Sequence, residues 1–351
     1  MITKHYFGAL EDGRAVYSYL LRHQSGMTLR ILELGGAIME LCVPDRKGRF
    51  TNVVASYDSL ADYLLDTTYF GALIGRVANR IAKGKYEIDG REYTAFINNG
   101  PSSLHGGRIG FSHRLWTVEP RDGEDPTLIL TLHSPDGEEG YPGNLDVTVT
   151  YTLFADAVSI RYEAVTDQCT PVNLTNHAYF NLGGYASGSI LGHTLRLDAD
   201  RFLPTDADLI PTGELRAVEG TPFDFRIPKV IGRDFDLVYP ELALAGGYDH
   251  CFCFIGGETE TPVLRAEAFE PISGRVMQVY TNQPCVQLYT GNFLKDPAHP
   301  LSGGYPQTPQ TAFCLETQKM PDALHHAHFD NIILSPGERY DYTTVYRFSV
   351  S

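Results

Sequence analysis

The stretch LDVTVTYTLF, Leu145 to Phe154, decides the fold class expected for this chain. Apolar and polar side chains alternate along it, and most of its residues are β-branched or aromatic. A period of two places successive side chains on opposite faces of an extended strand. The stretch therefore predicts a β-strand with one apolar face and one polar face.

The same alternation recurs along the chain, in TLILTLHS (Thr127 to Ser134), VSIRYEAV (Val158 to Val165) and YDYTTVYRFSV (Tyr340 to Val350). The segments DGEDP, PDGEEGYPG and GGETETP separate alternating runs, as hairpin turns do. Only SLADYLLD, from Ser59 to Asp66, is typical of a helix, with Asp58 or Ser59 as its N-cap. Strands are therefore expected to dominate.

The chain shows no linker-like block, no low-complexity stretch and no repeat at a fixed period. We therefore expect an all-β protein with a single domain over residues 1–351. One large antiparallel β-sandwich, with long connections that carry the polar motifs, is the simplest arrangement.

Charge and composition restrict the partners. The 351 residues are 43% hydrophobic, and 28 Lys+Arg against 43 Asp+Glu give a formal net charge of -15. This balance opposes binding to nucleic acid or to an anionic membrane surface and favours a small neutral ligand. No apolar run approaches the ~20 residues of a membrane helix, and the N-terminus lacks a signal-peptide pattern. The six cysteines form no CxxC pair, so we expect buried thiols in a soluble, cytoplasmic protein.

Five segments concentrate groups that donate, accept or move protons. They are GRVANRIAKG (residues 75–84), SSLHGG (102–107), NLTNHAYFNLGG (173–184), GGYDHCFCF (246–254) and FCLETQKMPD (313–322). Their separation in the sequence leaves open whether they meet in space. A structural role is the simplest explanation for each segment taken alone.

The segment NLTNHAYFNLGG is the most unusual of the five. If it is extended, His177 and Tyr179 point to one face while Ala178 and Phe180 point to the other. An imidazole beside an aromatic ring is a common sugar-facing surface. The alternative is that Tyr179 belongs to the core and His177 caps a turn.

Carboxylates and arginines supply further candidates. Glu316 ends an apolar strand run, and burial there would raise its pKa and make it a proton acceptor near neutral pH. Asp249 is a weaker candidate of the same kind, because it could cap its own turn. Asn79 and Arg80 would suit a loop that offers donors to hydroxyl oxygens, although Arg76 and Arg80 could equally be ordinary ion-pair partners.

Other signals are less informative. His105 lies beside Gly106 and Gly107, which permit close approach of a ligand or a tight turn. The HHAH run, from His325 to His328, lacks further ligands at a recognised interval, so a surface loop is expected and no metal site. No phosphate-binding loop, GxGxxG or GxSxG pattern is present.

Taken together, several motifs resemble those of the aldose 1-epimerase (galactose mutarotase) family, in the same order and over nearly the whole chain. They are GRVANRIAKGKYEIDGREY, SLHGG, GFSHRLW, NLTNHAYFNLGG, YDHCF, VQLYTGNF and ETQKMPD. The resemblance implies a galactose mutarotase-like supersandwich with an open cleft. It also implies interconversion of the α and β anomers of free hexoses, galactose and glucose, without cofactor or metal. Ala178 and Cys251 depart from the family's usual Ser and Asn.

The resemblance further implies a role for individual residues. It places Glu316 as the general base and His177 as the general acid, and it gives the sugar-binding positions as Asn79, Arg80, His105, Tyr179, Asp249 and Gln287. A carboxylate removes the proton of the C1 hydroxyl while an imidazolium protonates the ring oxygen. After rotation about the C1–C2 bond, the ring closes on its other face.

Three alternatives remain at this stage. A hexose-phosphate 1-epimerase would need a cationic pocket, for which only Arg76 and Arg80 are available. A non-catalytic sugar-binding protein would need neither Glu316 nor His177. A glycoside hydrolase could use Asp249 and Glu316 as its two carboxylates, but it would leave His177 without a role. The partner expected is a small neutral sugar, and the chain could be a monomer or a homodimer.

Overall fold

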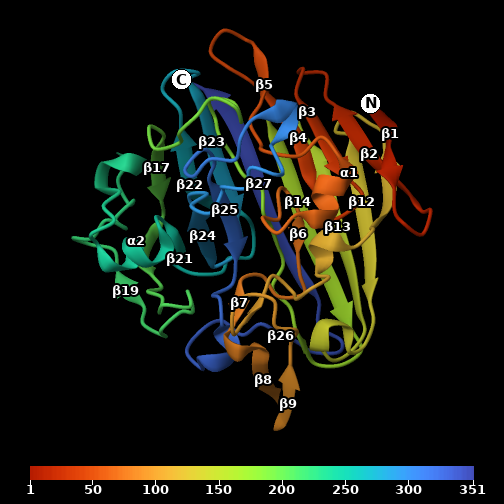
Figure 1. Ribbon diagram of the computed structural model, residues 1–351, viewed down its shortest axis with the longest axis vertical. Coiled ribbons are helices and arrows are strands. Elements are labelled where there is room, and N and C mark those ends of the chain that lie inside the picture. Colours follow the sequence, from red (N-terminus) through yellow and green to blue (C-terminus); the bar gives the residue numbers. More distant parts are fainter.

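The computed structural model describes residues 1–351 and is built almost entirely from antiparallel strands (Figure 1). The largest sheet has nine strands. In spatial order they are β11 (Thr117–Arg121), β12 (Thr127–Ser134), β13 (Leu145–Leu153), β14 (Ala157–Thr166), β27 (Tyr340–Val350), β23 (Arg275–Thr281), β22 (Val263–Phe269), β17 (Thr194–Leu197) and β20 (Lys229–Val230). The four stretches predicted as strands from their alternation all lie in this sheet, next to one another in the order β12, β13, β14 and β27.

Two five-stranded sheets cover one face of the large sheet. The first is β1 (Ile2–Ala9), β2 (Ala15–Arg22), β3 (Thr28–Leu32), β4 (Ile38–Pro44) and β5 (Phe50–Asn52). The second is, in spatial order, β19 (Arg216–Ala217), β18 (Ala199–Phe202), β21 (Asp249–Phe254), β24 (Cys285–Tyr289) and β25 (Cys314–Gln318). Apolar side chains from all three sheets form one continuous core of 56 buried residues. The expected single-domain β-sandwich is therefore confirmed.

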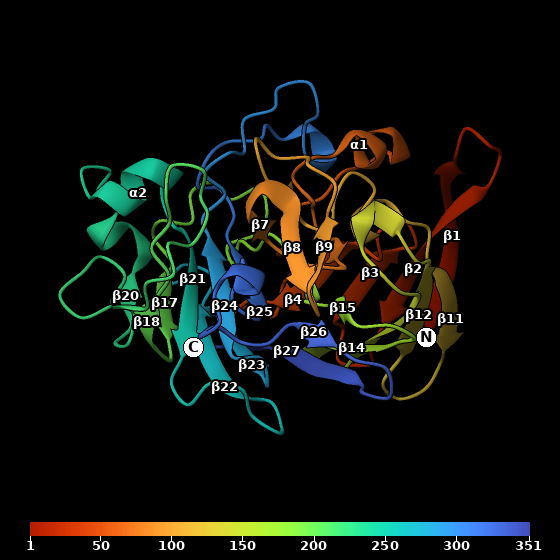
Figure 2. The same ribbon diagram turned by 90° about the horizontal axis from the view of Figure 1, so that it is seen from below.

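Four short strand pairs complete the fold. They are β6 (Leu73–Ile74) with β16 (Thr175–Asn176), β7 (Arg80–Ile81) with β10 (Ser103–Leu104), β8 (Lys85–Ile88) with β9 (Arg91–Thr94), and β15 (Thr170–Pro171) with β26 (Ile333–Leu334). The β8–β9 hairpin projects from the end of the molecule opposite both chain termini (Figure 1). Seen from that end, it lies in front of the sandwich (Figure 2).

Alternation explains the position of β13 in the core. Leu145, Val147, Val149, Tyr151 and Leu153 are buried, while the residues between them are partly or fully exposed. A strand of this kind covers the core with one face and meets solvent with the other.

The two helices are short. The predicted one is α1 (Leu60–Leu65), and the hydroxyl of Ser59 accepts a hydrogen bond from the N–H of Asp62 as its N-cap. The second, α2 (Pro240–Ala245), contradicts the expectation of a single helix. It is only six residues long, but proline at its start and Gly246 in the left-handed conformation after its end are the usual boundary signals. No helix is long and apolar enough to cross a membrane.

The segment from Asn173 to Gly184 runs between the two five-stranded sheets. Phe180 forms a bridge to Val54, just after β5, and another to Phe313, just before β25. Ala178 and Phe180 face the main core, as the alternation predicted, while Tyr179 packs in a separate cluster on the other face. The segment therefore connects the two sheets along one line.

Arg76 is not the ion-pair partner that the sequence suggested. It is 2% exposed, has no carboxylate partner, and donates to the hydroxyls of Ser134 and Thr170 and to three main-chain carbonyls between residues 134 and 142. The guanidinium thus joins the connection between β12 and β13 to the segment between β6 and β7, which carries Arg76. Burial lowers its pKa to about 10, which leaves it charged at neutral pH.

Replacing Arg76 by Met is expected to lower the free energy of unfolding by about 3 kcal/mol or more, since several buried acceptors would lose their donor. Denaturant unfolding measures this loss. The matched control, Arg108→Met, changes an exposed arginine and is expected to shift stability by less than about 0.5 kcal/mol. Equal effects of the two changes would contradict the role given to Arg76.

Candidate active site

A pocket of about 460 Å³ brings together residues from all five polar segments. It is lined by Asn79, Arg80, His105, His177, Tyr179, Asp249 and Glu316, which are seven of the eight predicted site residues. The eighth, Gln287, lies behind Asp249 and donates from its Nε2 to Oδ1 of Asp249 at 2.7 Å. Because the five segments are far apart in the sequence, the sequence alone had left open whether they meet in space.

Three asparagines hold the NLTNHAYFNLGG segment in place. The side chains of Asn173, Asn176 and Asn181 each donate to main-chain carbonyls of other segments, those of Lys319, Gly71 and Thr311. All three are at most 1% exposed. The amide-rich composition of the segment thus supports the backbone on either side of His177.

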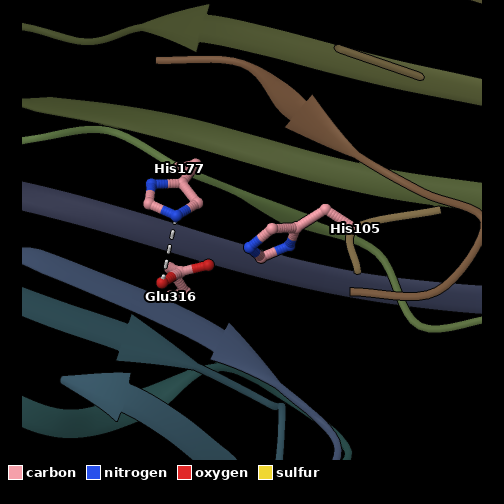
Figure 3. A group of neighbouring side chains, drawn as sticks. All are labelled: His105, His177 and Glu316. Atoms are coloured by element: carbon pink, nitrogen blue, oxygen red, sulfur yellow. Dashed lines mark ion pairs between the residues drawn. The ribbon is translucent and has the colours of Figure 1, made fainter. Parts of the chain in front are cut away.

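His177 and Glu316 face each other across the pocket. Nε2 of His177 lies 3.6 Å from Oε1 of Glu316, and both residues are buried (Figure 3). Oε2 of Glu316 has no hydrogen-bond partner within the chain, while Nδ1 of His177 lies 3.5 Å from Sγ of Cys314. The pair therefore has hydrogen-bonding capacity that a bound ligand could use.

Burial dominates the protonation of this pair. It raises the pKa of Glu316 well above 4.5, an effect that Asp249 increases and Arg80 opposes. It lowers the pKa of His177 to about 4. Burial therefore favours a neutral carboxyl and a neutral imidazole, and the imidazolium expected from the sequence is disfavoured because it would be desolvated.

Arg80 is the pocket's only lysine or arginine. Its Nε donates to Oδ1 of Asn99 at 3.2 Å, and its guanidinium makes no other hydrogen bond within the chain. The other guanidinium N–H groups are free to meet hydroxyl oxygens of a ligand. Asp249, whose pKa burial raises, provides an acceptor.

Aromatic rings surround His177. The ring of Tyr179 stacks on it with centroids 5.0 Å apart, and the Tyr179 hydroxyl donates to the carbonyl of Thr68. Tyr69 also stacks on it, with centroids 5.9 Å apart, and Tyr289 meets it edge-on at 6.3 Å. Tyr179 is thus a support for His177 as well as a lining residue.

Several lining residues were not found from the sequence. Tyr69, Asn99, Asp208, Tyr289 and Phe293 all line the pocket. Tyr289 and Phe293 lie in VQLYTGNF, which was quoted for another residue, but Tyr69, Asn99 and Asp208 occur in loops without a recognisable motif.

The cysteines agree only in part with the expectation of buried thiols. All six are free thiols, but Cys42 and Cys169 are partly exposed, while Cys251 and Cys253 are buried in one small cluster. The HHAH run lies in a surface turn, where Nδ1 of His325 meets Asp322 at 2.7 Å and Nε2 of His328 donates to the carbonyl of Gly213.

Gly106 makes the close packing around His105 possible. Its φ is +89°, and a Cβ at this position would lie 1.8 Å from the carbonyl oxygen of Gly75. Any side chain would have to move the backbone that carries His105.

Gly106→Ala is therefore expected to lower the free energy of unfolding by about 2 kcal/mol or more and to reduce ligand affinity. The control is Gly90→Ala, because Gly90 has a φ of +79° but no atom near its Cβ position. This control is expected to cost only about 1 kcal/mol, from backbone strain alone. Thermal unfolding and ligand binding of both variants distinguish the two effects, and equal losses would show that packing against Gly75 is unimportant.

The fold and the pocket define an all-β sandwich protein with a buried carboxyl–imidazole pair in a polar, aromatic-lined site. The aldose 1-epimerase family model matches residues 17–347, and the chain belongs to this family. It is 46% identical to the galactose mutarotase of Bos taurus, over 100% of this chain and 99% of that protein.

Solved structures agree with this assignment. The galactose 1-epimerase of Lactobacillus acidophilus NCFM is similar with a TM-score of 0.87 at 27% identity, over 100% of this chain and 99% of the other. An aldose epimerase homologue from C. elegans has a TM-score of 0.86 at 30% identity, over 94% and 98% of the two chains. The expected supersandwich fold is thereby confirmed.

Proposed function

We propose that this protein is an aldose 1-epimerase that interconverts the α and β anomers of free hexoses such as galactose and glucose. The observation that carries the proposal is the buried pair of Glu316 and His177, separated by 3.6 Å across a pocket of hexose-accommodating size. Membership of the aldose 1-epimerase family supports the same reaction.

In this mechanism Glu316 is the general base and His177 the general acid. The carboxylate removes the proton of the C1 hydroxyl while the imidazolium protonates the ring oxygen, so the C1–O bond of the ring breaks and the open aldehyde forms. The pair then holds a neutral carboxyl and a neutral imidazole, which is the state that burial favours. Rotation about the C1–C2 bond and return of both protons close the ring as the other anomer.

Hydrogen bonds from the pocket walls position the sugar. We assign Asn79, Arg80 and His105 as donors, and Asp249 as the acceptor for sugar hydroxyls. Gln287 and Tyr179 were expected to contact the sugar, but their contacts within the chain support a role in positioning other site residues. Gln287 fixes the carboxylate of Asp249, and Tyr179 fixes the ring of His177.

The charge of the pocket supports a neutral substrate. Asp208, Asp249 and Glu316 line it against the single guanidinium of Arg80, and Arg76 faces away into the core. A phosphorylated hexose would meet three carboxyl groups and one arginine. Free sugars are therefore favoured over hexose phosphates.

The location, oligomeric state and partners of the protein are also part of the proposal. We propose that the chain acts as one unit over residues 1–351, in the cytoplasm, as a monomer or homodimer, without nucleic acid or membrane partners. The net charge of -15 supports the last point. Sedimentation of the purified protein determines the oligomeric state.

The pH dependence of kcat/KM is expected to be bell-shaped. The reaction needs one proton shared between Glu316 and His177. On the acid side, activity falls near the His177 pKa of about 4, where the pair takes up a second proton on His177. On the alkaline side, activity falls as pH rises through the raised pKa of Glu316, when the last shared proton is lost. Polarimetry over a pH series, corrected for the uncatalysed rate and checked for folding by circular dichroism, measures both limbs. A rate that only increases with pH would contradict a shared proton.

Polarimetry also tests the proposed function itself. Freshly dissolved α-galactose or α-glucose is expected to reach its unchanged final rotation faster when catalytic amounts of the protein are present. The same measurement on glucose 6-phosphate tests the substrate class. No acceleration with either free sugar, by folded protein, would refute the proposal.

A further inference from the structure

Three pocket side chains form a set that is common in transition-metal sites. His105, His177 and Glu316 each offer one ligand atom, and these atoms all lie within 4.8 Å of one another (Figure 3). Two histidines and one carboxylate suit several divalent transition metals. A histidine binds a metal through one ring nitrogen only if that nitrogen carries no hydrogen, which places the hydrogen on the other nitrogen. The tautomer of each ring therefore decides between metal ligand and hydrogen-bond donor.

The main chain of Asn79 determines the tautomer of His105. The N–H of Asn79 donates to Nδ1 of His105 at 3.2 Å. A main-chain N–H can only donate, so Nδ1 must be the acceptor and carry no hydrogen. In the neutral ring the hydrogen consequently lies on Nε2, the nitrogen that the pocket can reach.

The backbone holds this contact firmly. The N–H of His105 donates to the carbonyl of Asn79 at 3.0 Å, so the two residues are bonded in both directions. They directly adjoin the paired strands β7 and β10, in which Arg80 faces Leu104. Asn79 and His105 both have left-handed backbones, with φ of 61° and 52°, a strained conformation that only firm packing maintains.

The groups around the ring keep it neutral. His105 is buried, and its ring meets those of Tyr69 and His177 with centroids 4.7 and 5.2 Å apart. Burial, together with the charges of His177 and Arg80, lowers the pKa of His105 well below 6.5. The carboxyl of Glu316 is the acidic group in this cluster, and it lies on the Nε2 side of the ring rather than beside Nδ1 (Figure 3).

We propose that the main-chain N–H of Asn79 locks His105 in the Nε2–H tautomer, which gives the pocket a permanent donor and prevents the three side chains from acting together as a transition-metal site. If a metal bound Nε2, the ring hydrogen would move to Nδ1 and face the N–H of Asn79, donor against donor. The donor role toward a sugar oxygen rests on the proposed function, whereas the tautomer and the exclusion of metal do not.

Nitrogen-15 NMR of the sugar-free enzyme with labelled histidines tests the tautomer. The His105 signals, assigned by their loss in His105→Gln, are expected to show a protonated Nε2 and a bare Nδ1 without change from about pH 5 to 8. A hydrogen on Nδ1, or titration of the ring within this range, would overturn the proposal.

Zinc titration followed by calorimetry tests the exclusion of metal. The zinc affinity of the native enzyme is expected to equal that of His105→Gln, because His105 contributes no ligand. A loss of about tenfold or more in His105→Gln would show that the ring does coordinate the ion and that the lock fails.

A pair of amide substitutions tests the donor. The side-chain nitrogen of Gln lies about as far from the backbone as Nε2, whereas that of Asn lies nearer to the position of Nδ1. His105→Gln is expected to keep a larger share of kcat/KM than His105→Asn, and equal losses would remove the donor role. If the native enzyme shows no epimerase activity, the proposed function fails, while the NMR and zinc results still decide the tautomer.

Discussion

Replacing Glu316 by Gln is expected to lower kcat by a factor of about 10²–10⁴, the usual contribution of a positioned general base. The amide keeps the shape of the neutral carboxyl but cannot accept the proton of the C1 hydroxyl. Because the pocket walls are unchanged, KM is expected to change much less than kcat. Polarimetry at saturating sugar measures the loss.

Stability provides the control for this variant. Folding raises the pKa of Glu316, so the folded protein holds this proton more tightly than the unfolded chain, whose pKa is near 4.5. The carboxyl therefore disfavours folding increasingly as pH rises above that value. Glu316→Gln removes this cost, and its melting temperature at pH 7 is expected to equal or exceed that of the native protein.

The matched change at a buried carboxylate outside the pocket is Glu33→Gln. Glu33 accepts hydrogen bonds from the N–H of Tyr17 and the hydroxyl of Tyr19, so this change affects stability and leaves kcat intact. A normal rate in Glu316→Gln, or an equal loss in Glu33→Gln, would show that Glu316 is not the base.

The second large effect is expected from His177→Asn, which removes the ring nitrogen that faces Glu316. The kcat is expected to fall by about 10²–10³, while KM changes little because the binding contacts proposed for Arg80 and Asp249 are left in place. Combining this change with Glu316→Gln is expected to cost little more than the larger single loss, since the two groups share one proton. Full additivity of the two losses would contradict their action as a pair.

His193 offers the corresponding control. It is also buried but does not line the pocket, and its Nε2 accepts the N–H of Leu182. His193→Asn is expected to reduce stability without reducing kcat. An effect of His177→Asn on KM alone would assign His177 to binding.

The regular part of this fold could be predicted from local patterns. The alternation in Leu145–Leu153 repeats the geometry of a strand, so the sequence itself shows which face is buried. The helix α2 was missed because six residues are too few for a periodic signal, although Pro240 and Gly246 mark its ends. Local reasoning is therefore reliable where a pattern repeats and weak where an element is a single turn.

The site could be predicted only in part. The resemblance to a family identified seven lining residues, but it could not show that Gln287 contacts Asp249 or that Arg76 faces the core. Nor could it show that burial favours the neutral form of His177, because that depends on desolvation by residues far away in the sequence. Asn99 and Asp208 line the pocket from loops whose conformation no local pattern encodes.

The place of β27 has a consequence for how the protein forms in the cell. This strand is the last in the chain, yet it lies in the middle of the nine-stranded sheet, between β14 and β23. During synthesis on the ribosome, the two halves of that sheet must wait for it with unpaired edges, which are prone to aggregation. Closure then depends on contacts between parts of the chain that are distant in sequence, so folding should be slow.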